Sequence, residues 1–182
     1  LTGLVYGTRS TQEQFVISLE RMNQIEDVDL VGRTITCQSG VTLQTIQELA
    51  EENNMMFPLD LGARGSCSIG GNIATNAGGN RVIRYGMMRD SVLGLEAVLA
   101  DGTVLTSMNT MIKNNAGYDL KQLFIGTEGT LGIITRCVLR LREAPLSQNT
   151  GLVALENLDS VIRFLKIVDS KLGGNMSAFE VM

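Results

Sequence analysis

A glycine-rich run at residues 58–79 has the composition of a loop that binds an anionic ligand. Glycine lacks a Cβ, so several backbone N–H groups can approach the oxygens of one anion closely. A diphosphate is the expected ligand of such a loop. The glycines of this run are Gly62, Gly65, Gly70, Gly71, Gly78 and Gly79. Side-chain donors are available from Ser66, Thr75 and Asn76. A short helix predicted to begin near Gly70 would direct its positive end toward the same oxygens.

The same run also has a purely structural interpretation, because glycine serves mainly in turns and a tightly turned β-protein would need it as well. A second glycine cluster, at residues 124–135, likewise allows both a ligand-binding and a structural interpretation. Its glycines, Gly126, Gly129 and Gly132, precede an apolar strand, so this loop could lie against a flat ligand with Ile133 and Ile134 as apolar walls. An ordinary loop between a helix and a strand would show the same spacing.

Several well-known site types are absent from the sequence. There is no G-x-G-x-x-G, no G-x-x-x-x-G-K-[ST] and no G-x-S-x-G, which excludes the common dinucleotide-binding motif, a P-loop and a serine-hydrolase elbow. The chain has no histidine, and its cysteines, Cys37, Cys67 and Cys137, lie far apart. We therefore predict no metal site and no catalytic residue within this sequence, and we interpret Cys67 as a packed thiol.

Charge and hydropathy exclude two classes of partner. The formal net charge is −4 and the pI is about 4.9, with scattered rather than clustered Lys and Arg, so we expect no nucleic acid partner. The apolar runs, such as residues 132–138, are shorter than the roughly 18 residues that a membrane span requires. Three cysteines without a disulfide pattern favour a reducing compartment, either the cytoplasm or, in a eukaryote, the mitochondrial matrix.

The elements that must position these loops can be predicted from hydrophobic periodicity and from turn and cap residues. Strands are expected at residues 25–30, 33–38 and 132–142, together with a hairpin of residues 92–100 and 103–106 around a two-residue Asp101-Gly102 turn. Helices are expected from Thr42, a good N-cap, to about residue 53, and at residues 120–124. Residues 14–22 fit either a strand or a helix that begins with a capping box, Ser10 and Glu13.

Beyond Pro145 the pattern changes to a β-α-β unit with too little apolar surface to fold alone. A strand at 151–155 is followed by a helix that Asn157 would cap and Gly173 would end, and an extended segment resumes at 177–182. We predict one domain at residues 1–145 and the start of a second at 146–182. The sequence begins with Leu1 rather than Met and ends within an apolar segment, so we expect an internal fragment of a longer protein.

Several ordered motifs resemble the FAD domain of the vanillyl-alcohol oxidase or PCMH type, especially its branch of D-2-hydroxyglutarate and D-lactate dehydrogenases. The matching segments are residues 2–5, 70–79, 84–86, 92–102, 117–120 and 126–134, and residues 177–180 resemble the start of the substrate domain of the family. The resemblance implies an α+β fold with an antiparallel-rich sheet flanked by helices. It also implies that residues 14–22 form a strand.

By the same resemblance, these segments would bind FAD noncovalently. The residues implied are Thr2, Gly3, Pro58, Leu59, Asp60, Gly62, Gly65, Ser66, Ile69, Gly70, Gly71, Asn72, Thr75, Asn76, Gly78, Gly79, Glu128, Gly129, Gly132, Ile133 and Ile134. Asn115 and Tyr118 are weaker candidates, and packing would explain Tyr118 equally well. Arg81, Arg84 and Arg89 could reach the diphosphate, although a solvated or ion-paired role is the more common one for surface arginines.

The implied activity is oxidation of a D-2-hydroxy acid, of the D-2-hydroxyglutarate or D-lactate type, to the 2-oxo acid by hydride transfer to flavin N5. The implied partners are this small-molecule substrate, an electron acceptor such as an electron-transfer flavoprotein, a quinone or a cytochrome, and a second copy in a homodimer. Any divalent metal would be bound downstream of Met182. A non-catalytic module that binds FAD or another diphosphate stays open, as does a glycine-rich domain without a cofactor.

Overall fold

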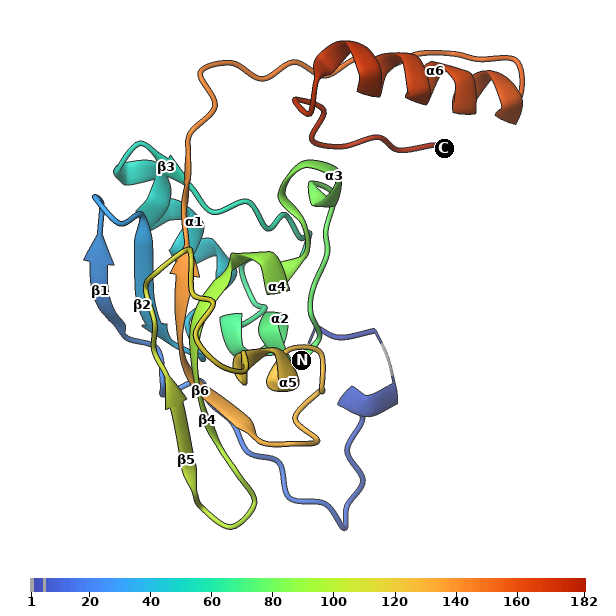
Figure 1. Cartoon of the computed structure of the whole chain (residues 1–182). Helices are drawn as coiled ribbons and strands as arrows, with labels where there is room; N and C mark the ends of the chain where they lie inside the picture. Colours follow the sequence, from blue (N-terminus) through green and yellow to red (C-terminus); the bar gives the residue numbers. More distant parts are fainter. Residues whose placement is uncertain (1, 5) are drawn as a thin grey trace.

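The computed structural model describes residues 2–4 and 6–182 of the chain. A five-stranded sheet, in the order β1-β2-β6-β4-β5, forms its centre, and every neighbouring pair of strands is antiparallel (Figure 1). The strands are β1 (Ile25–Asp29), β2 (Thr34–Gln38), β4 (Val92–Val98), β5 (Val104–Ser107) and β6 (Ile133–Arg140). This arrangement confirms the predicted α+β fold with an antiparallel sheet and flanking helices.

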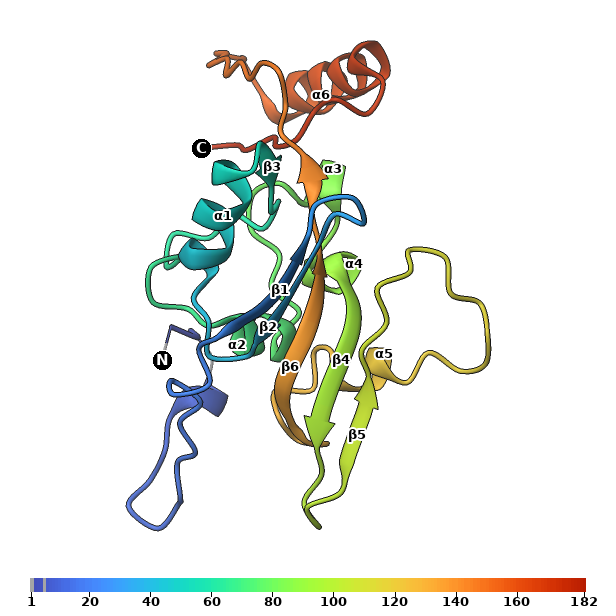
Figure 2. The same ribbon diagram turned by 90° about the vertical axis from the view of Figure 1, so that its left-hand side faces the viewer.

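Two helices, α1 (Leu43–Glu52) and α2 (Ile69–Ala74), lie on one side of the sheet (Figure 2). The sequence determines α1 locally, because the Thr42 hydroxyl accepts the Thr45 N–H and the apolar residues recur on one face. Leu43, Ile46 and Ala50 are completely buried and share one core with the inner face of the sheet, and the half-buried Leu49 packs against this core. The predicted helix after Thr42 is therefore confirmed, with its N-cap as expected.

The other elements are short, apart from one helix near the C-terminus. They are η1 (Tyr6–Thr8), β3 (Met55–Met56), α3 (Val82–Tyr85), α4 (Met88–Ser91), α5 (Lys121–Phe124), β7 (Arg142–Glu143) and α6 (Leu158–Leu172). Strands β3 and β7 form a separate two-stranded sheet. Residues 108–118 extend from the side of the main sheet opposite α1 and α2 (Figure 2), and the backbone at Asn109 passes so close to Gly94 that a Cβ there would lie 2.6 Å from its nitrogen.

The predicted hairpin around Asp101-Gly102 is confirmed, but its turn is longer than two residues. The last paired residues are Val98 and Val104. Between them the Gly102 N–H donates to Leu99 O at 3.0 Å, and of the Asp101-Gly102 pair only Gly102 has a positive φ, of +85°. A two-residue type I′ turn needs a positive φ at both positions, so the chain forms a tight turn followed by one left-handed glycine instead.

The prediction that residues 14–22 form a strand is wrong, and the helical alternative does not form either. Phe15, Val16 and Ile17 are exposed. The segment lies at the end of β2 rather than along an edge of the sheet, since the Gly40 N–H donates to Met22 O at 2.8 Å. Alternating apolar residues cannot make a strand without a neighbour that accepts the ladder of hydrogen bonds.

In the C-terminal segment the helix is confirmed and the two predicted strands are not. Helix α6 has Asn157 as its N-cap, with the side chain accepting the Ser160 N–H, and it ends at a left-handed Gly173. Residues 151–155 and 177–182 have no strand pairing. No residue of α6 is buried, and the helix contacts its own tail through the rings of Phe164 and Phe179, 6.2 Å apart. Within the described ranges, no helix is both long and apolar enough to cross a membrane.

Two cysteines in the centre of the sheet make stability depend on pH. Cys37 on β2 faces Cys137 on β6, with their sulfur atoms 3.6 Å apart and both side chains fully buried. The hydrogen bond with Cys37, together with burial, raises the pKa of the Cys137 thiol well above its ordinary value. An unfolded chain releases this proton at about pH 8.5, whereas the folded chain still holds it there.

We therefore expect the unfolding free energy to fall as the pH rises above about 8.5, by at most about 1.4 kcal/mol per pH unit from this thiol. Urea unfolding between pH 7 and pH 10 measures the effect. The variant Cys137→Ala should show a smaller decrease over this interval. An equal decrease in the variant would show that other groups cause it.

Candidate functional site

Helix α2 is the centre of the glycine-rich run, but its N-terminus is closed. The Ile69 N–H donates to Val41 O at 2.8 Å, and the Gly70 N–H donates to Ser39 O at 2.7 Å. The Gly71 N–H is taken by the Ser68 hydroxyl. The prediction that this end of the helix faces a ligand is therefore wrong, because its first amides bind the β2–α1 connection instead.

The C-terminal end of α2 brings the two glycine clusters together. The Ile73 carbonyl accepts the Gly126 N–H at 3.1 Å, and the Ala74 carbonyl accepts the Glu128 N–H at 2.8 Å. The Ala74 carbonyl would otherwise have no partner at the end of the helix, whereas the Ile73 carbonyl also accepts the Asn76 N–H at 3.0 Å. The loop at 126–132 is thereby fixed beside residues 75–79, although about fifty residues separate them in the sequence.

A close backbone contact joins the start of the glycine-rich run to its end. Gly79 has a φ of +76°, and a Cβ at this position would lie 2.1 Å from Asp60 O. Only glycine can have both this conformation and this contact without strain. The side chain of Asp60 forms an ion pair with Arg81, with 3.2 Å between Oδ2 and Nε. Residues 58–62 and 78–81 are thus held as one unit.

The amides of Gly78 and Gly79 remain available for a ligand. Both belong to the part of the chain that the structure describes, and neither donates to another group there. Gly79 is exposed and Gly78 half-buried. Adjacent amides that lack acceptors favour an anion, and a diphosphate offers oxygens at a suitable spacing. The open backbone at Gly79, where a side chain would collide with Asp60, therefore fits the diphosphate predicted from the sequence.

The predicted site residues fall into three classes of exposure. Ten are exposed, and these are Thr2, Gly3, Gly62, Gly65, Ser66, Gly71, Thr75, Gly79, Glu128 and Gly129. Five are half-buried, and these are Asp60, Asn76, Gly78, Gly132 and Ile133. Six are buried, and these are Pro58, Leu59, Ile69, Gly70, Asn72 and Ile134. Among the buried members, Leu59, Ile69 and Ile134 belong to the hydrophobic core, so their side chains contribute packing.

The predicted side-chain donors are largely used within the chain. The Thr75 hydroxyl donates to Gly71 O at 2.9 Å, and the Ser66 hydroxyl donates to Ala63 O at 3.3 Å. Asn76, with a φ of +47°, accepts the Arg89 N–H on its Oδ1 at 3.0 Å. Backbone amides are therefore the main free donors of this site.

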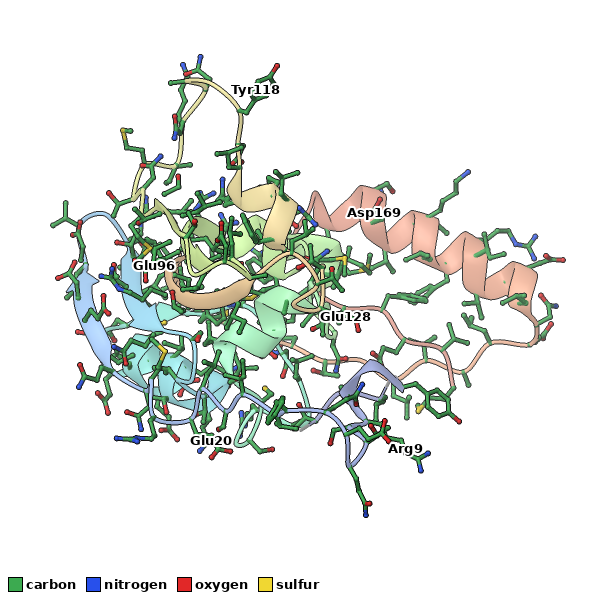
Figure 3. All side chains as sticks on the ribbon, turned by 90° about the horizontal axis from the view of Figure 1, so that it is seen from below. Arg9, Glu20, Glu96, Tyr118, Glu128 and Asp169 are labelled. Carbon is green, nitrogen blue, oxygen red and sulfur yellow. The ribbon has the colours of Figure 1, made fainter. Side chains whose placement is uncertain are left out.

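The N-terminal segment reaches the second glycine cluster. A Cβ on Gly7 would lie 2.9 Å from a carboxylate oxygen of Glu128, so this segment lies against the loop at 126–132. Thr2 and Gly3 are described there, whereas Val5, part of the same sequence motif, lies outside the described residues. Figure 3 shows Glu128 beside the end of α2 and Tyr118 at the tip of a loop far from it. Tyr118 is 95% exposed, so neither packing nor the site accounts for it.

Two further expectations from the sequence concern Cys67 and metal binding. Cys67 is buried and lies 3.6 Å from the Asn72 amide nitrogen, which confirms a packed thiol. Among the described residues, no cluster of three or more His, Cys, Asp or Glu side chains could hold a metal ion.

Sequence reasoning missed Gln47, and it named Arg89 as a possible diphosphate contact but missed its role in positioning the loops. The Gln47 amide on α1 donates to Leu59 O at 2.7 Å and is buried. Arg89 donates through Nη2 to Ile125 O at 2.7 Å and through Nη1 to Gln122 O at 3.1 Å. Arg89 thus fixes the approach to the loop at 126–132 through its guanidinium. No sequence motif signals contacts to backbone carbonyls so distant in the chain.

We expect Arg89→Met to weaken binding of a diphosphate cofactor about tenfold and to lower the unfolding free energy by about 1.5–3 kcal/mol. The substitution keeps the length of the side chain and removes every hydrogen bond to residues 122–125. Cofactor titration and urea unfolding measure the two effects. Arg163→Met is the matched control, because among the described residues the Arg163 guanidinium donates only to Ser160, on its own helix. Unchanged affinity in Arg89→Met would mean that this clamp does not position the binding loop.

Comparison with known proteins gives one family match and several long alignments. A family model described as an FAD binding domain matches residues 2–107. The mitochondrial D-2-hydroxyglutarate dehydrogenase of Bos taurus is 45% identical over 181 residues, which cover 100% of this chain and 33% of the relative. A D-2-hydroxyglutarate dehydrogenase of Xanthomonas citri pv. viticola is 45% identical over 179 residues, which cover 98% of this chain and 38% of the relative.

A solved structure of alkyldihydroxyacetonephosphate synthase has the same fold over much of the chain. The TM-score is 0.60 at 26% sequence identity, and the match covers 70% of this chain and 22% of that one. The chain spans about a third of the length of the curated relatives it matches.

Proposed function

Because the chain belongs to the FAD binding domain family, we propose that its loops hold the diphosphate of FAD within an FAD-dependent dehydrogenase of D-2-hydroxy acids. One observation carries the proposal: two adjacent amides without acceptors, at Gly78 and Gly79, lie where the backbone packs directly on Asp60. The remaining proposed contacts are those predicted from the sequence, except the amides of Ile69, Gly70 and Gly71, which bind acceptors within the chain. The loop at 126–132 is the proposed second wall. The binding is noncovalent.

When bound, FAD would accept a hydride at N5 from the α-carbon of the hydroxy acid, which becomes a 2-oxo acid. The residues of this chain would bind and orient the cofactor, and they would exclude water from the diphosphate. The 45% identity to D-2-hydroxyglutarate dehydrogenases, which extends over nearly all of this chain, supports a D-2-hydroxy dicarboxylate as the substrate. The general base, and any divalent metal, would come from residues outside this sequence, which has no histidine.

We also propose that residues 1–145 form the FAD-binding domain and that residues 146–182 begin the substrate domain. The lack of any buried residue in α6 supports this division, since such a helix needs further chain to cover its apolar side. The electron acceptor would be an electron-transfer flavoprotein, a quinone or a cytochrome, and the protein would act as a homodimer. Its compartment would be the cytoplasm or the mitochondrial matrix; the bovine relative is named as mitochondrial.

Anaerobic reduction of the purified full-length protein tests the proposed function. We expect the oxidised-flavin absorbance to disappear on addition of D-2-hydroxyglutarate, with the L-enantiomer as the control. If the protein holds flavin but no D-2-hydroxy acid reduces it, the protein is a module that binds FAD without oxidising these acids. Protein purified without flavin, and unable to take it up, would contradict the proposal itself.

A further inference from the structure

A cavity of about 440 Å³ lies between α3 and the segments 145–149 and 172–177. This volume is within the range of about 300–1,000 Å³ that small-molecule sites occupy. The cavity is separate from the free amides of Gly78 and Gly79, but Arg81 connects the two places, because it lines the cavity and pairs with Asp60. A ligand in the cavity would therefore lie next to the cofactor-binding loops.

The lining of this cavity is positive. It includes Arg81 and Arg84, and no aspartate or glutamate. The charge of Arg81 is partly balanced by Asp60, whereas Arg84 has no acidic partner among the residues that the structure describes. The remaining polar lining is neutral and comes from serine, asparagine and glutamine side chains, and the apolar part comes mainly from Met56, Pro145, Leu146 and Leu172.

The guanidinium of Arg84 is held in place while most of its donors remain free. It lies 5.2 Å from the centre of the Tyr85 ring, a cation–π distance. Its single recorded hydrogen bond runs from Nη1 to Asn175 O, at 3.4 Å. A guanidinium has five N–H donors, so Arg84 can still bind a carboxylate through two parallel hydrogen bonds.

The surroundings of Arg84 select the kind of anion. A short carbon chain fits between the apolar side chains of the lining, and the neutral polar groups can bind hydroxyl or carbonyl oxygens. A carboxylate at the end of such a chain matches the planar fork of an arginine. A small organic acid satisfies all three parts of the lining, whereas a free phosphate would use only the arginines.

We propose that Arg84, assisted by Arg81, forms a subsite for a carboxylate group of a small organic acid in this cavity. The inference rests on the proposed function, in which that acid is the 2-hydroxy dicarboxylate substrate. The inference adds Arg84 as the residue that would bind one carboxylate of the substrate. Arg84 lies on the FAD-binding side of the proposed junction with residues 146–182.

Glutarate, a dicarboxylate that cannot be oxidised at a hydroxyl carbon, is the probe. We expect it to bind the FAD-loaded full-length protein in a calorimetric titration, and Arg84→Gln to weaken this binding about ten- to a hundredfold. The affinity for FAD should be unchanged, because Arg84 does not contact the free amides. Arg163→Gln, which removes the same charge from exposed α6, should leave both affinities unchanged.

Unchanged glutarate binding in Arg84→Gln, or no glutarate binding by the unmodified protein, would overturn the subsite. Stronger binding of inorganic phosphate than of glutarate would also overturn it. If Arg84→Gln loses its flavin, Arg84→Lys decides by the same titration, since it keeps the charge and loses the planar fork. Failure of the proposed function gives a different result: flavin reduction would be absent while glutarate binding could still depend on Arg84.

Discussion

Replacing Gly79 by alanine is expected to reduce FAD binding at least about a hundredfold. The backbone at this position has a φ of +76°, which costs a residue with a Cβ about 1–2 kcal/mol. The new Cβ would also lie 2.1 Å from Asp60 O, a backbone atom that cannot rotate away. The loops at 58–62 and 78–81 must then separate, and the free amides lose their arrangement. Titration of the flavin-free protein with FAD measures the loss.

The matched control for this substitution is Gly102→Ala. Gly102 also has a positive φ, of +85°, but nothing lies within 4 Å of its Cβ position, and it belongs to the distant hairpin turn. It should reproduce the backbone strain without the collision and leave FAD affinity unchanged. If Gly79→Ala binds FAD as well as Gly102→Ala does, the contact between Gly79 and Asp60 has no role in binding.

The second large effect is expected on stability and concerns Gly70. A Cβ there would lie 2.6 Å from Ser39 Cβ and 3.1 Å from Ser39 O, in the buried contact between α2 and the chain that follows β2. We expect Gly70→Ala to lower the unfolding free energy by about 1–3 kcal/mol, as overpacking in a closed core does. Urea unfolding without FAD measures this effect separately from any change in binding.

The neighbouring glycine provides the comparison. Gly71 is exposed in the same helix, and its nearest neighbour would be the Ser68 hydroxyl at 3.2 Å. Alanine is favoured over glycine in a helix by about 1 kcal/mol, so Gly71→Ala should be neutral or stabilising. A Gly70→Ala variant as stable as Gly71→Ala would show that the close packing of α2 on Ser39 is not needed.

Elements with strong local signals could be predicted from the sequence. Helix α1 follows from the Thr42 cap and the spacing of its apolar residues, and α6 follows from Asn157 and Gly173. The hairpin of β4 and β5 follows from Asp101-Gly102, although the length of the turn does not. In each case, residues close to one another in the sequence determine the structure.

The sequence could not show which apolar segments would fail to form strands. Residues 14–22, 151–155 and 177–182 all have apolar or alternating patterns, and none pairs with another strand. A strand depends on partners that can lie anywhere in the sequence, whereas a helix satisfies its own backbone. The family resemblance also implied a strand at residues 14–22, and that prediction was wrong.

The candidate site shows the same division. Composition singled out the glycine-rich run, but it cannot tell a glycine that packs, such as Gly70, from one that opens the backbone, such as Gly79. Arg89 acts over 36 residues of sequence to hold Ile125 O, and no spacing encodes this contact. Only the folded chain separates these roles.

A crystal structure of the full-length protein with FAD tests the central claim most directly. We expect a diphosphate oxygen to lie within about 3.2 Å of the amide nitrogen of Gly78 or Gly79. A structure in which FAD is bound but both amides face water or another part of the protein would contradict it.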